Sequence, residues 1–222
     1  MGMGMVPFKI DFILDGTGVY FDRQEPPHLD SLLAWTRSGN HKYIERDDCP
    51  DEIKVPLMES RVGGHLVRHG SALFIEKHFE TMRFWRKKIR RNRLQYTTGS
   101  PNATMGIYRE YNMPVQLVLT RNVSCYGFGD IGDVKCLLFN NIKALGKKRS
   151  QGYGRIVNID IHEIDDDKSL VYDGLAMRWL PDDDGSRLVR CKPPYWNNTD
   201  KVMCCEVFDM YDKNRIESHE CN

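Results

Sequence analysis

One glycine-framed basic loop decides the fold prediction: Gly146-Lys147-Lys148-Arg149-Ser150-Gln151-Gly152-Tyr153-Gly154-Arg155-Ile156. Upstream, residues 130–145 carry apolar side chains at helical spacing, and Asp130 is a candidate N-cap. Gly146 suits the position just after a helix, where the backbone often turns left-handed. Downstream, residues 155–164 alternate in the manner of a strand. The loop is therefore predicted to join a helix to a strand.

This loop has the composition of a phosphate-backbone contact. Glycine lets the main chain approach an anion closely, and exposed N–H groups and the cations of 147–149 and Arg155 supply positive charge. Tyr153 adds an aromatic ring on which an unpaired base can stack. The order helix–loop–strand is the reverse of a dinucleotide fingerprint, and no Lys-Ser/Thr pair completes a Walker A motif. No nucleotide cofactor is predicted, and a solvated surface turn is the alternative.

A second basic element lies within a predicted insertion at about 76–98, and its core from 83 to 93 has no acidic residue. A helix would align Phe79, Met82, Arg86 and Ile89 on one face, whereas a long hairpin is the competing prediction. Such a run is commonly a solvated face, but a polyanion would relieve the repulsion among its cations. The cations are Arg83, Arg86, Lys87, Lys88, Arg90, Arg91 and Arg93.

Near the start of the chain, residues 7–14 alternate apolar and polar, which predicts a half-buried strand. Residues 28–35 then read as a short helix with Leu29, Leu32, Leu33 and Trp35 toward the core. Two further segments, 55–62 and 65–75, are predicted strands. After the basic insertion, strands are predicted at 115–120 and 123–128, joined by a tight turn at Arg121-Asn122.

Two strand–helix–strand units in succession are typical of an α+β, ferredoxin-like fold with an antiparallel sheet and helices on one face. RNA-binding domains of this shape use the free face of the sheet. The last third adds a predicted hairpin of 175–180 and 187–191 around a turn at 181–186. A strand at 202–210 follows the extended segment 192–196. We predict a single domain over 1–222.

The bulk composition excludes several classes. The 222 residues carry a net charge of +1, so any nucleic-acid contact must come from local patches. No apolar run reaches the ~20 residues of a membrane span, and no signal peptide is evident, which predicts a cytoplasmic protein. The seven cysteines are expected to be reduced thiols, several of them buried.

Catalytic and metal chemistry are weakly indicated. None of the seven histidines can be placed at a scissile bond, although His65 and His69 would share the face of a strand. Cys191, Cys204, Cys205, His219 and Cys221 match no standard zinc spacing, so packing is the main prediction and a zinc-stabilised adaptor the alternative. The triplets 165–167 and 182–184 are aspartates in turn contexts, which favours solvated loops over a two-metal centre.

Several blocks together resemble one branch of the CRISPR-associated RAMP superfamily. The loop GKKRSQGYGRI before the strand IVNIDI resembles the superfamily's glycine-rich loop. HLDSLLAW, YTTGSPNATMGIYREYNMPVQLVL and KPPYW are similar to the crRNA 5′-handle-binding subunit of type IV effector complexes. These blocks span about residues 7–196.

The resemblance implies a ferredoxin-like RAMP core with a thumb-like basic insertion. It implies a non-catalytic subunit that binds the 5′ handle of crRNA and caps the filament of backbone subunits. Such a subunit also neighbours the large subunit and can touch target DNA. The loop residues Gly146, Lys147, Lys148, Arg149, Gly152, Tyr153 and Gly154 match the motif position by position. The alternative is a metal-independent endoribonuclease that processes precursor crRNA.

Overall fold

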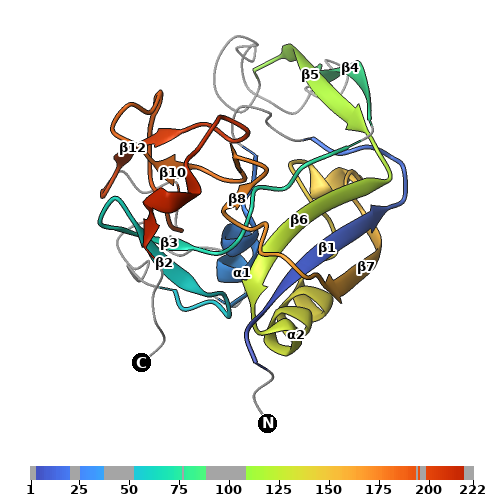
Figure 1. The fold of residues 1–222 in the computed structure, drawn as a ribbon. Coiled ribbons are helices and arrows are strands. Elements are labelled where there is room, and N and C mark those ends of the chain that lie inside the picture. Colours follow the sequence, from blue (N-terminus) through green and yellow to red (C-terminus); the bar gives the residue numbers. More distant parts are fainter. Residues whose placement is uncertain are drawn as a thin grey trace.

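The computed structural model describes residues 4–20, 26–37, 53–76, 78–88, 109–193, 195 and 199–217. Over these residues the protein is of the predicted α+β class, with antiparallel strands predominating and two α-helices (Figure 1). Within the same residues, no helix is both long and apolar enough to cross a bilayer.

The first sheet has the strand order β6-β1-β7. The predicted strand β1 (Val6–Leu14) is central, and β6 (Asn122–Gly129) and β7 (Ile156–Glu163) pair with it in antiparallel fashion. The even-numbered apolar side chains of β1, from Phe8 to Leu14, are buried as predicted. They form one hydrophobic core with residues of α1 (Leu29–Arg37) and α2 (Ile131–Asn141), so both helices cover the same face of the sheet.

An extended segment, residues 69–74, lies along the free edge of β6. The Phe74 and Ser124 amides exchange hydrogen bonds of 2.9 Å, and Ser71 N–H donates to the Tyr126 carbonyl at 2.8 Å. Isolated antiparallel bridges link Gly70 with Gly127 and Phe74 with Ser124. Across this layer the order is therefore β7, β1, β6 and then the 69–74 segment.

Helix α2 begins where predicted and ends earlier. The Asp130 carboxylate accepts from Asp133 N–H at 3.0 Å, which satisfies one of the unpaired amides of the first turn. The helix ends at Asn141, because Ile142 has an extended backbone. The prediction of a helix to Leu145 is therefore four residues too long. Ile142 and Leu145 nevertheless remain in the core, which explains why the apolar spacing continued past the helix.

Strands β4 (Phe79–Lys87) and β5 (Tyr111–Leu119) form a two-stranded ribbon, here called the arm, which lies beyond one end of the first sheet (Figure 1). The hairpin alternative is confirmed for the described part of the insertion, and the helix alternative is wrong there. Residues 89–108 lie outside the described chain. Because β5 pairs with β4 and β6 pairs with β1, the turn after Thr120 connects two sheets and does not close a hairpin.

The C-terminal part forms a second core beside the first sheet (Figure 1). The predicted hairpin of 175–180 with 187–191 is wrong, because a third strand separates its arms: Cys204 pairs with both Pro181 and Arg187. The predicted strand at 202–210 ends at Cys205. Residues 62 and 67, from earlier in the chain, also belong to this second core. The strands around it are β2 (Glu59–Val62), β3 (His65–Arg68), β8 (Val171–Tyr172), β9 (Leu175–Ala176), β10 (Leu180–Pro181), β11 (Arg187–Val189), β12 (Val202–Cys205) and β13 (Ile216–Glu217).

Candidate nucleic-acid interface

The glycine loop is held against the segment that follows β1. Lys147 N–H donates to the Tyr20 carbonyl at 3.0 Å, and Gly154 N–H donates to the Gly18 carbonyl at 2.8 Å. Leu145 N–H donates to the Gly154 carbonyl at 2.8 Å, which ties the two ends of the loop together. The base of the loop is therefore fixed by the core, and its tip projects from that base.

Two glycines are required by close approach of the main chain. A Cβ on Gly154 would lie 2.1 Å from the Leu145 carbonyl oxygen, and φ is +67° there. A Cβ on Gly146 would lie 2.6 Å from the Tyr20 carbonyl oxygen, with φ at +75°. Gly146 was predicted to follow the helix directly, but α2 ends at Asn141, and residues 142–145 lie between the helix and Gly146. The left-handed backbone of Gly146 instead turns the chain against Tyr20.

The tip of the loop is a short 3-10 turn, Arg149–Gln151, preceded by Lys148 in the left-handed region at φ 64°. Gln151 N–H donates to the Lys148 carbonyl, and Gly152 N–H donates to the Arg149 carbonyl. With Lys147 and Gly154, four main-chain amides of the loop are thus already occupied within the protein. The predicted grip by main-chain N–H groups is correspondingly reduced, and the side chains are left as the main source of contacts.

On one side of the loop, Lys148 reaches the arm. Its Nζ lies 3.0 Å from the centroid of the Trp85 ring, within the range of a cation–π contact. The Tyr153 ring packs edge-on against Tyr20, with centroids 4.7 Å apart. A hollow of about 200 Å³ lies between the loop and the arm. Its lining consists of Tyr20, Arg83, Phe84, Trp85, Val115, Lys148, Gln151 and Tyr153.

On the other side, Arg149 reaches α1. Its Cζ lies 5.1 Å from the Trp35 ring centroid. A larger hollow of about 360 Å³ separates the loop from α1, and Lys147 and Arg149 contribute its cations. Trp35 was predicted to face the core together with Leu29 and Leu33, which are fully buried, but its side chain is 39% exposed. The prediction for Trp35 is wrong, because this position turns away from the core toward the loop.

The structure thus brings the two predicted basic elements to one surface. Of the arm's cations, Arg83 lines the smaller hollow, and the exposed Arg86 donates from Nε to Asn112 Oδ1 at 2.9 Å on the opposite face of the ribbon. Lys87, Lys88, Ser150 and Arg155 are exposed, but they line neither hollow. The remaining predicted contacts, Arg90, Arg91 and Arg93, lie outside the described chain.

Tyr20 was missed from the sequence, Trp85 was given no role, and Trp35 was assigned to the core instead of to the site. Tyr20 reaches the site only through the pairing of residue 20 with residue 147, a long-range contact without a local signal. Trp85 could have been found, because it alternates with cations at the strand period of two. Trp35 could not be separated from the apolar face of its helix by spacing alone.

None of the histidines that the structure describes lines either hollow. His69 is buried, with Nδ1 2.8 Å from Asp167 Oδ2 and Nε2 2.8 Å from Ser60 Oγ, whereas His65 on the same strand segment is exposed. The prediction that His65 and His69 share one face is therefore wrong, because one side chain is exposed and the other is buried. Among the described residues, no group of three or more His, Cys, Asp or Glu side chains is arranged to hold a metal ion. His219 and Cys221 lie outside those residues.

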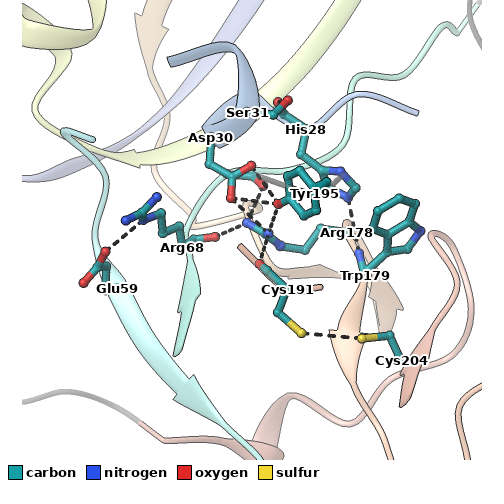
Figure 2. A network of polar contacts seen from close by, with 11 residues as sticks. His28, Asp30, Ser31, Glu59, Arg68, Arg178, Trp179, Cys191, Tyr195 and Cys204 are labelled. Atoms are coloured by element: carbon teal, nitrogen blue, oxygen red, sulfur yellow. Dashed lines mark hydrogen bonds and ion pairs between the residues drawn. The ribbon is translucent and has the colours of Figure 1, made fainter. Parts of the chain in front are cut away.

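A buried polar network connects α1 to the second core (Figure 2). Arg178 Nη2 donates to Asp30 Oδ2 at 3.1 Å, to the Tyr195 hydroxyl at 2.6 Å and to the Cys191 carbonyl at 2.7 Å. Its Nη1 donates to the carbonyls of Arg68 and Gly70. Both Arg178 and Asp30 have fully buried side chains. This network is a structural tie between the two cores, because its charged pair is fully buried and its contacts join α1 to the C-terminal part.

The charges of this network are set by burial and pairing. Burial alone would lower the pKa of Arg178, but the Asp30 carboxylate outweighs it and raises that pKa. Burial, assisted by the Arg178 charge, holds the pKa of His28 well below its usual value. The main-chain N–H of Trp179 donates to His28 Nε2 at 3.4 Å, which requires an unprotonated Nε2 and suits a neutral ring. Burial raises the pKa of Tyr195, so its hydroxyl remains a hydrogen-bond donor to Asp30.

The cysteines pack largely as predicted. Cys125, Cys191, Cys204 and Cys205 are buried free thiols, and Cys136 is an exposed one. Cys191 Sγ and Cys204 Sγ are 3.5 Å apart (Figure 2), and this hydrogen bond lowers the pKa of Cys191. These residues belong to the hydrophobic core of the C-terminal part.

Fold and site together define an α+β protein with a cationic, aromatic-lined surface built around a glycine loop. A family model described as CRISPR type IV associated protein Csf3 matches residues 84–207, more than half of the chain. The chain therefore belongs to this family, and the resemblance to a type IV CRISPR-associated subunit is confirmed. No match was found among curated proteins.

Proposed function

We propose that this protein is a non-catalytic RNA-binding subunit of a type IV CRISPR ribonucleoprotein complex. In this role the loop and the arm hold the 5′ handle of crRNA, and the protein caps the filament of backbone subunits next to the large subunit. Membership in the Csf3 family supports the assignment to a type IV complex. Contact with target DNA, near the short DNA motif adjacent to the target sequence, is part of the same proposal. It follows from the resemblance alone.

One observation carries the RNA-binding part of the proposal. Lys148 contacts Trp85 across a hollow that both basic elements line. Cations for phosphates and aromatic faces for bases are the two components of a single-strand binding surface. Among the described residues, the lining of both hollows contains no Asp, Glu or His, and the charge that these residues give the site suits a polyanion.

The topology supports a ferredoxin-like RAMP core. The chain order is strand, helix, extended segment, strand, helix, strand, and the layer order is β7, β1, β6 and the 69–74 segment. This is the arrangement expected of two interleaved strand–helix–strand units. The arm is then the thumb-like insertion, placed between the 69–74 segment and β6.

The free face of the sheet is a poorer RNA surface than the loop. Asp11 of β1 and Asp160 of β7 lie opposite one another in the pairing register, on the face away from the helices. Asp11 also forms an ion pair with Lys9, with Oδ1 3.0 Å from Nζ, which neutralises a positive charge on that face. Adjacent carboxylates repel phosphate, so we place the RNA at the loop and not on the sheet face predicted from the fold.

Replacement of Lys147, Lys148 and Arg149 by alanine tests the proposal. We expect weaker crRNA binding and a shallower salt dependence, with the slope of log K against log salt falling by about 0.7 for each lost phosphate contact on a single strand. Binding is measured by fluorescence anisotropy at several salt concentrations. The control replaces three exposed lysines outside both hollows, Lys135, Lys201 and Lys213. An unchanged slope in the loop variant would exclude the loop from RNA binding.

The absence of catalysis is tested with the same preparation. Labelled precursor crRNA incubated with the wild-type protein and EDTA should remain intact. Discrete cleavage that leaves a 2′,3′-cyclic end would instead favour the metal-independent endoribonuclease.

A further inference from the structure

We infer that the hollow between α1 and the glycine loop receives one unstacked nucleobase of the bound RNA, with the Trp35 indole as its stacking surface. This inference rests on the proposed RNA-binding function and assigns a part of it that the loop cations alone do not explain. The cations account for affinity to the phosphate backbone of any RNA sequence, whereas a base pocket fixes the position of a particular nucleotide.

The shape of the hollow fits a base and not only a phosphate. Its volume of about 360 Å³ falls in the range of small-molecule sites, whereas the hollow beside the arm, at about 200 Å³, lies below it. Most of its lining is apolar or aromatic, and polar groups are few, as in sites that enclose a planar ligand. The apolar and aromatic members are Tyr20, Pro27, Leu32, Trp35, Ile142, Ala144 and Leu145.

The charge of the hollow selects an anionic ligand. Of the described residues that line it, Lys147 and Arg149 are cationic and none is acidic. A nucleotide places an apolar ring and a phosphate a short distance apart, which matches an apolar slot with cations at its rim. The loop between the two hollows carries the cations, so a strand crossing the loop can direct a base to the α1 side.

Trp35 has the geometry of a stacking platform. It is partly exposed, and the Arg149 guanidinium lies over its ring at 5.1 Å. A cation at the face of an indole is displaced at little cost when a base stacks there, because the cation then pairs with the phosphate of the same nucleotide.

The wall that carries Trp35 is preorganised. Ser31 lines the hollow, and its hydroxyl donates to the His28 carbonyl at 2.7 Å. The preceding residue, Asp30, is fixed by Arg178 and Tyr195 (Figure 2). Helix α1 is thus anchored in the core on one side and exposes Trp35 on the other. A rigid wall reduces the ordering cost of ligand binding.

The test compares two RNA probes and three variants. The probes are a short single-stranded oligoadenylate and the same oligomer with its bases removed to leave abasic riboses. Trp35→Ala should weaken binding of the oligoadenylate by about tenfold and leave binding of the abasic oligomer unchanged. Trp35→Phe should retain most of the affinity. Leu188→Ala, which truncates an exposed apolar side chain on β11, is the matched control.

Three outcomes overturn the inference. The first is Trp35→Ala binding oligoadenylate as the wild type does. The second is an equal loss on both probes, which would limit Trp35 to positioning Arg149. The third is unchanged RNA binding together with Trp35-dependent binding of a Glu- and Phe-containing peptide, which would assign the hollow to a protein partner. The proposed function fails separately, if the triple loop variant binds both RNA probes as the wild type does.

A second measurement needs no variant. The wild-type protein is photo-crosslinked to an oligonucleotide that carries 4-thiouridine, and the adducts are mapped by mass spectrometry. Crosslinks to Trp35 or Leu32 are expected. Crosslinks confined to the arm would overturn the inference even if Trp35→Ala failed to fold.

Discussion

Two arginine-containing regions of this molecule use the same charge in opposite ways. Arg178 is fully buried, and its guanidinium is bonded to a carboxylate, a phenol and three main-chain carbonyls. Arg149 and Lys148, at the tip of the loop, face two indole rings instead. The hydrogen bonds of Arg178 are all made within the protein. The loop cations instead lie against aromatic rings, from which a ligand can displace them.

The difference separates stability from binding. An uncompensated buried charge is costly, so Arg178 and Asp30 depend on one another for charge compensation where the two cores meet. Exposed cations near aromatic rings contribute little to stability, because water screens them. Variants around Arg178 should therefore mainly change the free energy of unfolding, whereas variants of the loop cations should mainly change RNA affinity.

The largest effect is expected from Arg178→Met. The Asp30 carboxylate would remain buried without its partner, and removing one member of a buried pair typically costs about 3–5 kcal/mol. Urea denaturation measures the loss. RNA affinity per folded molecule should fall less than in the triple loop variant, because Arg178 lines neither hollow and affects the site only by anchoring α1 through Asp30.

A double variant sharpens this result. Arg178→Met combined with Asp30→Asn removes both charges, and we expect it to be more stable than Arg178→Met alone. Equal instability of the single and double variants would mean that the carbonyl contacts of Arg178, and not its pairing with Asp30, hold the two cores together.

Sequence patterns predicted the elements of the first sheet because these depend on local periodicity. The alternation in residues 7–14 and the helical spacing after Asp130 are each readable within one segment. The arm remained ambiguous between helix and hairpin, because the described strand β4 is mostly exposed and offers no buried face to set a period. The order β10-β12-β11 could not be predicted, since β12 follows both neighbours in the chain and yet lies between them in the sheet.

The site was predicted in part for the same reason. The cations of the loop were found from composition alone, and Lys147–Arg149 are where the two hollows meet. The partners Tyr20 and Trp35 depend on contacts between the loop and segments more than a hundred residues earlier in the chain. The Arg178–Asp30 pair was missed completely, because neither residue belongs to a recognisable motif.

Two glycines of the loop, Gly154 and Gly152, should differ in how much an added side chain destabilises the protein. Gly154→Ala must pay for a left-handed backbone and for the contact with the Leu145 carbonyl oxygen, so we expect a loss of at least about 2 kcal/mol and weaker RNA binding. Gly152→Ala is the matched control, because φ is +90° there but nothing lies within 4 Å of the added Cβ. It should cost about 1–2 kcal/mol. Equal losses in urea denaturation would show that the backbone angle alone, and not close packing, requires the glycine at 154.

The smallest effect is a pH dependence of the buried region. Because burial and Arg178 depress the pKa of His28 in the folded state, the unfolded chain binds a proton below the ordinary value of 6.5 and the folded protein does not. The stability provided by neutral His28 is therefore complete above pH 6.5 and is lost as the pH falls below it. The expected slope is about 1.4 kcal/mol per pH unit until the folded pKa is reached.

His28→Gln isolates this contribution. Glutamine keeps an acceptor near Trp179 N–H and does not titrate, so the variant should lose less stability than the wild type between pH 7 and pH 5, the window that spans the ordinary pKa. His162→Gln, at an exposed position of β7, should retain the wild-type slope. A His28→Gln slope equal to that of the wild type would mean that His28 is protonated in the folded protein, next to the Arg178 guanidinium. The buried region would then tolerate an additional positive charge, and the contrast with the exposed loop would no longer rest on charge compensation.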